Sequence, residues 1–175
     1  MPARNIRHPS VFDVTAYGAI GDGTTKETKA INKAIEACAQ TGGGTVHFPP
    51  GRYLTGSVVL RSNVTLHIGA GAMIVGSPDR EDYPIISDGY FYGPYRGYHT
   101  ALITGTDLEN VAVTGQGIID GQGANWWPLK RLQNKWARYV EAGIDTLPAG
   151  EEEAFDEIRY AGTTKRPNLM EFIRC

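Results

Sequence analysis

The sequence predicts a mainly β fold in which short strands stack as the coils of a solenoid. Its 175 residues fit one domain, and 22 glycines and 10 prolines make a turn-dense composition that suits many short strands better than a helical bundle. After residue 55, short runs of β-type residues follow one another, and Gly or Asn separates nearly all of them. Two such stretches, beginning at Asn63 and at Asn110, also resemble each other, as the repeats of a solenoid do.

The composition and the charge exclude several classes of protein. Seventeen Lys and Arg against 19 Asp and Glu give a net charge of −2, which excludes a basic nucleic-acid binder. With 41% hydrophobic and 21% charged residues the chain is expected to fold, and no apolar run approaches the roughly 18 residues of a membrane span. Cys38 and Cys175 form no CxxC pair, so we expect two buried free thiols and neither a disulfide framework nor a zinc knuckle.

The N-terminal unit, residues 11–41, is predicted to be a strand followed by a helix. Alternating apolar residues predict a half-buried strand over 11–17, and they are Phe12, Val14 and Ala16. Helical spacing then places four apolar residues on one stripe, namely Ile31, Ala34, Ile35 and Cys38. Thr24 or Thr25 is the expected N-cap, and the three glycines at 42–44 end the helix.

Residues 45–121 are predicted to form the first coils. The predicted strands cover 45–48, 52–54, 57–60, 64–68, 72–75, 101–104, 111–114 and 117–120. The two similar stretches, Asn63–Gly76 and Asn110–Gly121, begin 47 residues apart. If that distance covers two turns of the chain, each coil has about 23 residues, within the roughly 20 to 50 residues typical of repeat architectures.

Two segments interrupt the coils and are predicted to be insertions. Residues 78–100 carry six aromatic side chains on a path rich in Gly and Pro, which predicts a long ordered loop. Residues 124–165 begin with a helical pattern and end in a charged stretch, before the next predicted strand at 169–174. In repeat folds, insertions of this kind cluster on the binding face.

Four segments resemble family 28 of the glycoside hydrolases, the polygalacturonase-like enzymes of the pectin-lyase-like superfamily. They are Phe12–Thr25, Ala30–Ile35, Gly42–Gly56 and Gly115–Trp127, and they occur in the order that the family has. The first block is shared with lyases, epimerases and phage tailspikes, whereas Gly117–Trp127 and Arg166–Phe172 look like the hydrolases in particular. The resemblance implies a right-handed parallel β-helix that the predicted helix caps at its N-terminus.

The resemblance also implies a function. It points to a glycosidase that cleaves galacturonan-type pectic, or related acidic, polysaccharide with inversion, a reaction that uses two carboxyl groups about 6.5 to 9.5 Å apart. Enzymes of the family carry these groups in Asn-Thr-Asp and Asp-Asp motifs, followed by Gly-His-Gly and Arg-Ile-Lys, and none of the four motifs occurs here. In family order they follow Arg166–Pro167. We therefore expect a truncated, N-terminal part of a longer enzyme that is inactive alone, assign no catalytic residue, and expect no cofactor.

Candidate substrate-binding residues lie in the first insertion and directly after the second. Tyr92 and Tyr95 could stack on sugar faces while Arg96 contacts a carboxylate, although these rings could equally pack on one another to hold the loop. Arg166 completes this set of candidates. Adjacent tryptophans at a helix start commonly anchor it, so Trp126 and Trp127 are expected to lie in the core. Asp120 and Asp22 precede glycines in turns and are expected to accept backbone hydrogen bonds.

No metal site is expected from the histidines. His47 alternates with Val46 and Phe48 and so faces away from them, and His67 and His99 look isolated. The chain offers no carboxylate or Cys at ligand spacing from any of them. A calcium-dependent pectate lyase relative, one rival interpretation, would need clustered acidic ligands. A second rival is a non-catalytic β-helix that binds carbohydrate, such as a tailspike or an adhesin.

Two expectations concern the ends of the chain. The polar N-terminus lacks the apolar stretch of a signal peptide, so the protein is expected to be cytoplasmic, or secreted or periplasmic with its leader removed. The last predicted strand has apolar residues and no polar cap after it, which predicts self-association through an uncapped coil. The expected partner is a polysaccharide or oligosaccharide, with no nucleic acid and no membrane.

Overall fold

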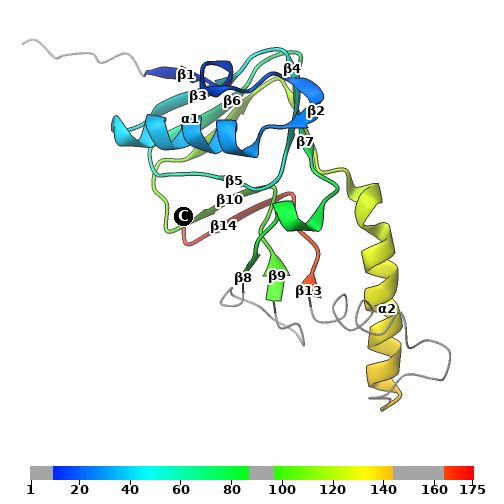
Figure 1. The fold of residues 1–175 in the computed structure, drawn as a ribbon. Coiled ribbons are helices and arrows are strands. Elements are labelled where there is room, and N and C mark those ends of the chain that lie inside the picture. The colour runs from blue at the N-terminus through cyan, green and yellow to red at the C-terminus, as the bar shows by residue number, and fades with distance from the viewer. Residues whose placement is uncertain (1–9, 87–96, 144–163) are drawn as a thin grey trace, which may run out of the picture.

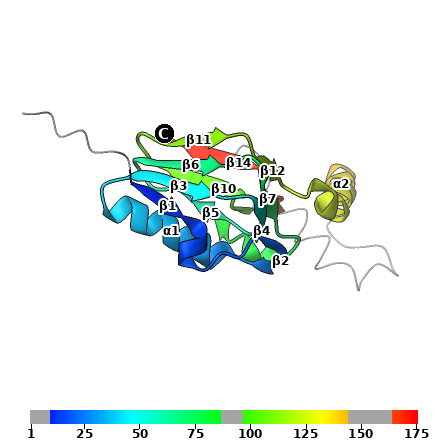
Figure 2. The same ribbon diagram turned by 90° about the horizontal axis from the view of Figure 1, so that it is seen from above.

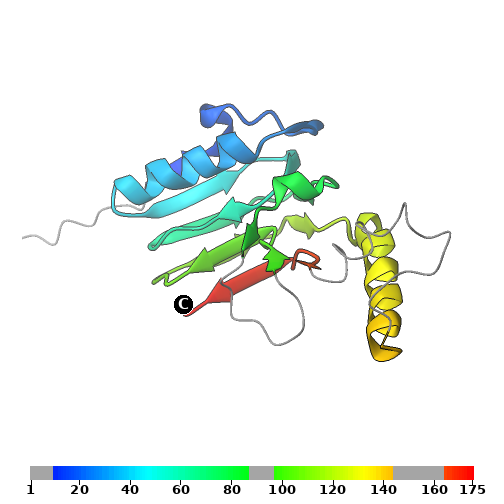
Figure 3. The ribbon, with the colours of Figure 1, turned by 60° about the horizontal axis from the view of Figure 1, so that its bottom comes forward.

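From the third strand onward, each turn of the chain adds one strand to each of three parallel sheets (Figure 1, Figure 3). The computed structural model describes residues 10–86, 97–143 and 164–175. Neighbours within each of the three sheets come from successive turns, and all of these pairs are parallel. The described chain is therefore a parallel β-helix, which confirms the predicted mainly β fold class.

The three sheets and a small fourth one have short strands. Sheet 1 consists of β1 (Val11–Asp13), β3 (Gly44–Phe48), β6 (Val64–Ile68) and β11 (Ala112–Gly115). Sheet 2 consists of β2 (Asp22–Lys26), β4 (Gly51–Thr55), β7 (Ala72–Gly76) and β12 (Ile118–Asp120). Sheet 3 consists of β5 (Val58–Val59), β10 (Ile103–Thr106) and β14 (Met170–Ile173). Sheet 4 consists of β8 (Ile85–Ile86), β9 (Gly97–His99) and β13 (Thr164–Lys165).

The register of sheet 1 corrects the predicted coil length. Thr45 pairs with Thr65, 20 residues later, so one uninterrupted turn is shorter than the expected 23 residues. Thr65 then pairs with Ala112, 47 residues later. The two similar stretches are therefore adjacent turns and not turns two apart. The first insertion makes up the difference in length between these two turns.

The core lies inside the coils because alternate residues of each strand point inward. Val46 and Phe48 of β3 and Leu66 and Ile68 of β6 are buried, whereas the residues between them are partly exposed. The Phe48 ring meets the Tyr53 ring edge-on, with centroids 5.3 Å apart. Each fully buried side chain of this size stabilises the fold by about 1.5 to 3 kcal/mol.

Helix α1 (Thr28–Gln40) covers the N-terminal end of the stack, against β1, β3 and β5 (Figure 2). Its four predicted core residues, Ile31, Ala34, Ile35 and Cys38, are at most 1% exposed. This confirms the predicted stripe and the burial of Cys38. The other cysteine, Cys175, is exposed and not buried as expected, because it follows the last strand of the described chain.

The start of α1 differs from the prediction. Neither Thr24 nor Thr25 is the N-cap, because both belong to β2, which pairs with β4. The N-cap is Glu27, and its own side chain caps no helical N–H group. The Glu27 carboxylate is buried and instead accepts hydrogen bonds from the backbone N–H groups of Ile20 (2.6 Å) and Gly21 (2.7 Å). It therefore holds the preceding turn against the helix.

Only the first three residues of the predicted 11–17 strand are extended. The Asp13 carboxylate accepts hydrogen bonds from the Thr15 N–H (2.9 Å) and hydroxyl (2.6 Å), and residues 14–17 form a 3₁₀ turn, η1 (Val14–Tyr17). Val14 is buried as predicted, but Ala16 is exposed. Asp13 therefore ends β1, since a short acidic side chain that binds the following N–H groups competes with the strand ladder.

Both insertions leave the coils between sheet 2 and sheet 3. The first leads from β7 through η2 (Arg80–Asp82) and sheet 4 to β10, and the second leads from β12 through η3 (Gly123–Trp126) and α2 (Trp127–Glu141) to β14. Strand β9 of the first pairs with β13 of the second. Helix α2 extends away from the coils (Figure 1). No helix among the described residues is long and apolar enough to cross a membrane.

Candidate functional site

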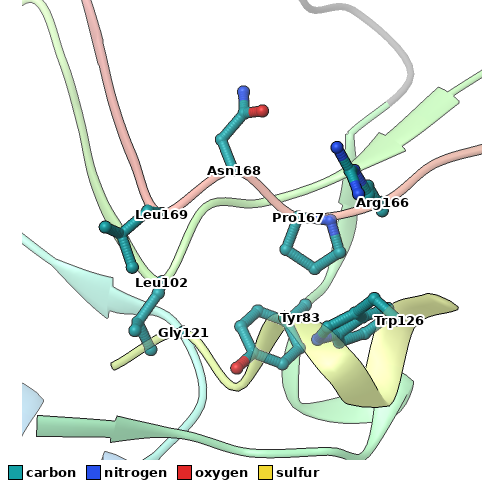
Figure 4. Close-up of a pocket in the computed structure, with 9 residues that line it drawn as sticks. Tyr83, Leu102, Gly121, Trp126, Arg166, Pro167, Asn168 and Leu169 are labelled. Carbon is teal, nitrogen blue, oxygen red and sulfur yellow. The ribbon is translucent and has the colours of Figure 1, made fainter. Parts of the chain in front are cut away.

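A pocket of about 380 Å³ lies where the two insertions leave the coils (Figure 4). Its lining residues come from both insertions and from the turns beside them: Tyr83, Leu102, Gly121, Gly123, Trp126, Arg166, Pro167, Asn168 and Leu169. Pockets that bind small ligands have volumes of roughly 300 to 1,000 Å³. The corner at which the insertions meet therefore offers a ligand-sized pocket.

Two buried aromatic rings form one wall of this pocket. Tyr83, which directly follows η2, is 2% exposed, and Trp126, at the end of η3, is 6% exposed. Their rings meet edge-on with centroids 5.5 Å apart. The Tyr83 hydroxyl donates a hydrogen bond to the Ser77 carbonyl (3.0 Å), and burial raises the pKa of this phenol, so it stays neutral. The wall is therefore closely packed and mainly apolar.

A polar segment, residues 166–168, forms the opposite side. Its backbone is held by the residue before β10, because the Leu102 N–H donates a hydrogen bond to the Asn168 carbonyl oxygen at 3.0 Å. The Asn168 amide extends away from Tyr83 and Trp126 in Figure 4. Arg166 is exposed, and no carboxylate in the described ranges lies within ion-pair distance of it. Arg166 is therefore available to bind an anionic group.

The base of the first insertion is tied to the N-terminal unit by Lys26. The Lys26 ammonium lies 2.6 Å from an Asp79 carboxylate oxygen and 2.7 Å from one of Asp82. Burial alone would raise the pKa of Asp82, but the hydrogen bonds from Lys26 and Ser77 lower it below its usual value. The backbone carbonyl of Asp82 accepts the Ser57 N–H (3.1 Å). These contacts fix the segment that leads into Tyr83.

The two carboxylates that contact Lys26 also form a candidate cation site. Asp79 and Asp82 are two carboxylates facing one point, and the Lys26 ammonium occupies that point. No group of three or more His, Cys, Asp or Glu side chains in the described part of the chain is arranged to hold a metal ion. Lys26, Asp79 and Asp82 therefore form an ion-pair network with one another.

The histidines on sheet 1 are not isolated. His47 pairs in register with His67, and their rings stack with centroids 5.7 Å apart. Asp13 lies at the other side of His47, with Oδ2 3.5 Å from Nδ1. His67 Nδ1 lies 3.1 Å from the Thr114 hydroxyl oxygen. The four side chains form an outward-facing row, because equivalent positions of successive turns lie side by side.

The turn aspartates are structural, as predicted. Asp120 accepts hydrogen bonds from the backbone N–H (2.9 Å) and the side-chain amide (2.5 Å) of Gln122. Asp22 accepts hydrogen bonds from the N–H groups of Thr25 (2.7 Å) and Thr24 (2.8 Å), and these bonds lower its pKa. Asp107 pairs with Arg174 through two hydrogen bonds of 2.5 and 2.7 Å.

Of the four predicted substrate-binding residues, the structure describes only Arg166. Arg166 lines the pocket, whereas Tyr92, Tyr95 and Arg96 lie outside the described residues. Trp126 is buried as expected, but Trp127 is 63% exposed, because it begins α2 where the helix leaves the coils.

Sequence reasoning missed Tyr83 and Trp126 as pocket residues. The available signal was the repeat, since β7 pairs with β12 and the two insertions follow these neighbouring strands directly. The first aromatic residues of the two insertions must therefore meet at one corner.

Several known proteins are similar to this chain in both sequence and fold. The chain is 40% identical over 119 residues to a probable polygalacturonase of Vitis vinifera, covering 63% of this chain and 24% of that protein. It is 38% identical over 125 residues to the exo-poly-alpha-D-galacturonosidase of Dickeya chrysanthemi, covering 66% of this chain and 20% of that protein. The family 28 exopolygalacturonase structure of Yersinia enterocolitica matches with a TM-score of 0.68 and 28% identity, over 95% of this chain and 33% of that one.

These matches define the family. The chain spans about a quarter or less of the length of the two curated relatives. Residues 11–135, more than half of the chain, match the family described as rhamnogalacturonase A/epimerase, pectate lyase-like. The right-handed parallel β-helix and the resemblance to glycoside hydrolase family 28 are thereby confirmed, and the chain belongs to the rhamnogalacturonase A/epimerase, pectate lyase-like family.

Proposed function

We propose that this chain forms the N-terminal coils and one end of the substrate cleft of a glycoside hydrolase that acts on galacturonan-type pectic polysaccharide. The observation that carries the proposal is the pocket in which an arginine, Arg166, lies with a buried aromatic wall at the meeting point of the two insertions. The polygalacturonase relatives support the substrate class.

The chemistry of the pocket suits a uronate sugar. A guanidinium group binds a carboxylate with two parallel hydrogen bonds, and this geometry selects a planar anion over a neutral hydroxymethyl group. Aromatic and aliphatic side chains offer contact to the C–H groups of a sugar ring, and Tyr83, Trp126 and Leu169 provide them here. Tyr92, Tyr95 and Arg96 remain proposed contacts from the first insertion.

The position of the insertions supports exo action. The two insertions stand on one corner of the coils, and the β9–β13 pair joins them. Such a joined pair would close one end of a cleft that runs along the coils, so a polysaccharide could enter only by its end. One relative is named an exo-poly-alpha-D-galacturonosidase, which agrees with this proposal.

The catalytic pair is proposed to lie outside these 175 residues. Inverting hydrolysis requires an acid and a base about 6.5 to 9.5 Å apart. Asp82 is engaged by Lys26 and Ser77, and Asp120 by Gln122, so neither carboxylate is assigned to catalysis. The Asn-Thr-Asp and Asp-Asp motifs are absent from the sequence.

Arg166 provides the test. In the complete enzyme, Arg166→Ala should raise KM for oligogalacturonate by roughly tenfold or more, the loss expected for a charge-assisted hydrogen bond. Arg166→Lys should restore part of the affinity, and Arg131→Ala, on the exposed side of α2, is the matched control. Tyr95→Ala and Arg96→Ala test the first insertion in the same assay. An unchanged KM for Arg166→Ala would contradict the proposed subsite.

We also propose that a polypeptide of these 175 residues self-associates through its exposed coil edge. Strands β11, β12 and β14 each lie at an edge of their sheet. Three large apolar side chains on these strands are exposed, namely Ile118, Met170 and Phe172. An unpaired strand edge with apolar side chains is a template for pairing with another chain.

A further inference from the structure

A buried imidazole lies behind the aromatic wall of the pocket. His99, the last residue of β9, is 2% exposed, and its Nδ1 lies 2.7 Å from the Tyr83 carbonyl oxygen. A carbonyl oxygen only accepts hydrogen bonds, so Nδ1 must carry the proton. The bond joins the two arms of the first insertion, since Tyr83 lies before residues 87–96 and His99 after them.

His99 also contacts the second insertion. Its ring lies 5.9 Å from the Trp126 ring, centroid to centroid, and Trp126 in turn meets Tyr83 at 5.5 Å. Tyr83 and Trp126 line the 380 Å³ pocket, whereas His99 lines a second cavity of about 260 Å³ to which Tyr83 also contributes. His99 therefore touches both residues of the wall without facing the pocket itself.

We propose that neutral His99 is the positioning residue of this pocket, and that its protonation loosens the Tyr83–Trp126 wall and weakens ligand binding as the pH falls. The ligand used to test this, a uronate oligosaccharide, rests on the function proposed above. The positioning role rests only on the geometry of the three side chains.

Burial and the nearby Arg80 favour the neutral form of His99. Burial lowers the pKa of His99, the hydrogen bond to Tyr83 opposes this, and the positive charge of Arg80 lowers it further. Glu81, an acidic residue that lines the same second cavity as His99, opposes these effects, whereas Arg166 lies on the pocket side and the Tyr83 phenol is neutral. A cation formed at this place would be partly dehydrated and repelled by Arg80, so protonation disturbs the packing of His99 against Trp126 and its contact with Tyr83.

Two substitutions test separately the hydrogen-bond donor and the aromatic ring of His99. His99→Asn can place an amide N–H close to the position of Nδ1 and does not titrate. His99→Phe keeps a ring beside Trp126 but has no donor for the Tyr83 carbonyl. His67→Asn, on the outer face of sheet 1, is the matched control because it also removes a histidine but lies away from the pocket.

The affinity for digalacturonate is then measured between about pH 5 and pH 8, where the ligand carboxylates stay ionised and histidine titrates. We expect the affinities of the wild type and of His67→Asn to fall by about tenfold toward the acid end of this range. A tenfold change corresponds to a difference of one pKa unit for His99 between the ligand-bound and the free protein. His99→Asn should bind equally well across the range, and His99→Phe should bind weakly throughout. A wild-type pH profile in His99→Asn would overturn the proposal.

Two readouts do not require the ligand. Nitrogen-15 NMR of the histidine side chains should show the Nδ1–H tautomer for His99 near neutral pH, and the Nε2–H tautomer would overturn the proposal. The fluorescence of Trp126 is the difference between the emission of a protein and that of its Trp126→Phe variant. This fluorescence should decrease in acid when His99 is present and stay constant in His99→Asn. If digalacturonate binds to no variant, the proposed function fails, while the fluorescence and the tautomer still decide the role of His99.

Discussion

The side-chain amide of Asn110 donates a hydrogen bond of 3.0 Å to the amide oxygen of Asn63, which occupies the same position one turn earlier. Both asparagines have a positive φ, 64° for Asn63 and 54° for Asn110. Asparagine tolerates this left-handed conformation better than other side chains do, and its amide can bind an identical amide above it. The pair therefore fixes the turn before sheet 1 in two successive coils.

Asn63→Ala should lower the free energy of unfolding by about 1.5 to 3.5 kcal/mol, the sum of a left-handed alanine and a lost hydrogen bond. Asn63→Gly keeps the backbone conformation and should lose only about 0.5 to 1.5 kcal/mol. Urea unfolding followed by circular dichroism measures both. Equal losses for the two variants would show that the positive φ carries no cost here.

Gly56→Ala should destabilise the protein, because the new Cβ would lie 2.3 Å from the backbone carbonyl oxygen of Asp82. The backbone of the first insertion would have to move, at a cost of about 1 to 3 kcal/mol. Gly123→Ala is the control, since nothing lies within 4 Å of its added Cβ. Thermal unfolding should separate the two variants clearly, and equal melting temperatures would contradict the close approach.

Asp82 should make stability depend on acid pH. Hydrogen bonds from Lys26 and Ser77 outweigh burial and lower its pKa in the folded state, so its contribution is present above the unfolded value of about 3.9 and is lost as the pH falls through the folded value. Asp82→Asn should flatten the decrease of unfolding free energy below about pH 4. Lys26→Met should also reduce this decrease, and Lys29→Met on the exposed side of α1 should not. A wild-type acid profile in Asp82→Asn would refute the assignment.

The 175-residue polypeptide should release no reducing ends from polygalacturonate. Asp82 and Asp120 accept hydrogen bonds from protein groups, and the family motifs are absent. A colorimetric reducing-sugar assay with long incubation checks this. Measurable hydrolysis would direct attention to Asp107 and Asp120, whose substitution by Asn would then be the decisive experiment.

The same polypeptide should form dimers or larger species at micromolar concentration. Ile118→Lys and Phe172→Lys place charges on the edge strands β12 and β14 and should shift the population toward monomer. Sedimentation velocity over a concentration series measures the distribution. A stable wild-type monomer throughout would contradict association through this edge.

Local patterns were predicted from the sequence because short-range geometry decides them. The helical stripe of Ile31, Ala34, Ile35 and Cys38 is buried as expected, since residues three and four apart share one face of any helix. Strand β6 has the predicted bounds for the equivalent reason, with alternate side chains pointing inward. The predicted start of α1 was wrong because β2 pairs with β4, which lies far from it in the sequence. This pairing places Thr24 and Thr25 in a strand.

The sequence by itself thus determined the fold class, the capping helix, the repeated stretches and the structural role of Asp120. Only the tertiary structure decided that 47 residues make one turn, that Trp126 is buried while Trp127 is exposed, and that Arg166 shares a pocket with Tyr83. These features depend on which strands stack. Tyr83 and Arg166 belong to different turns, and the parallel pairing of β7 with β12 and of β10 with β14 brings their segments to one corner. No local spacing in the chain encodes that meeting, because the hydrogen bonds that create it join residues far apart in sequence.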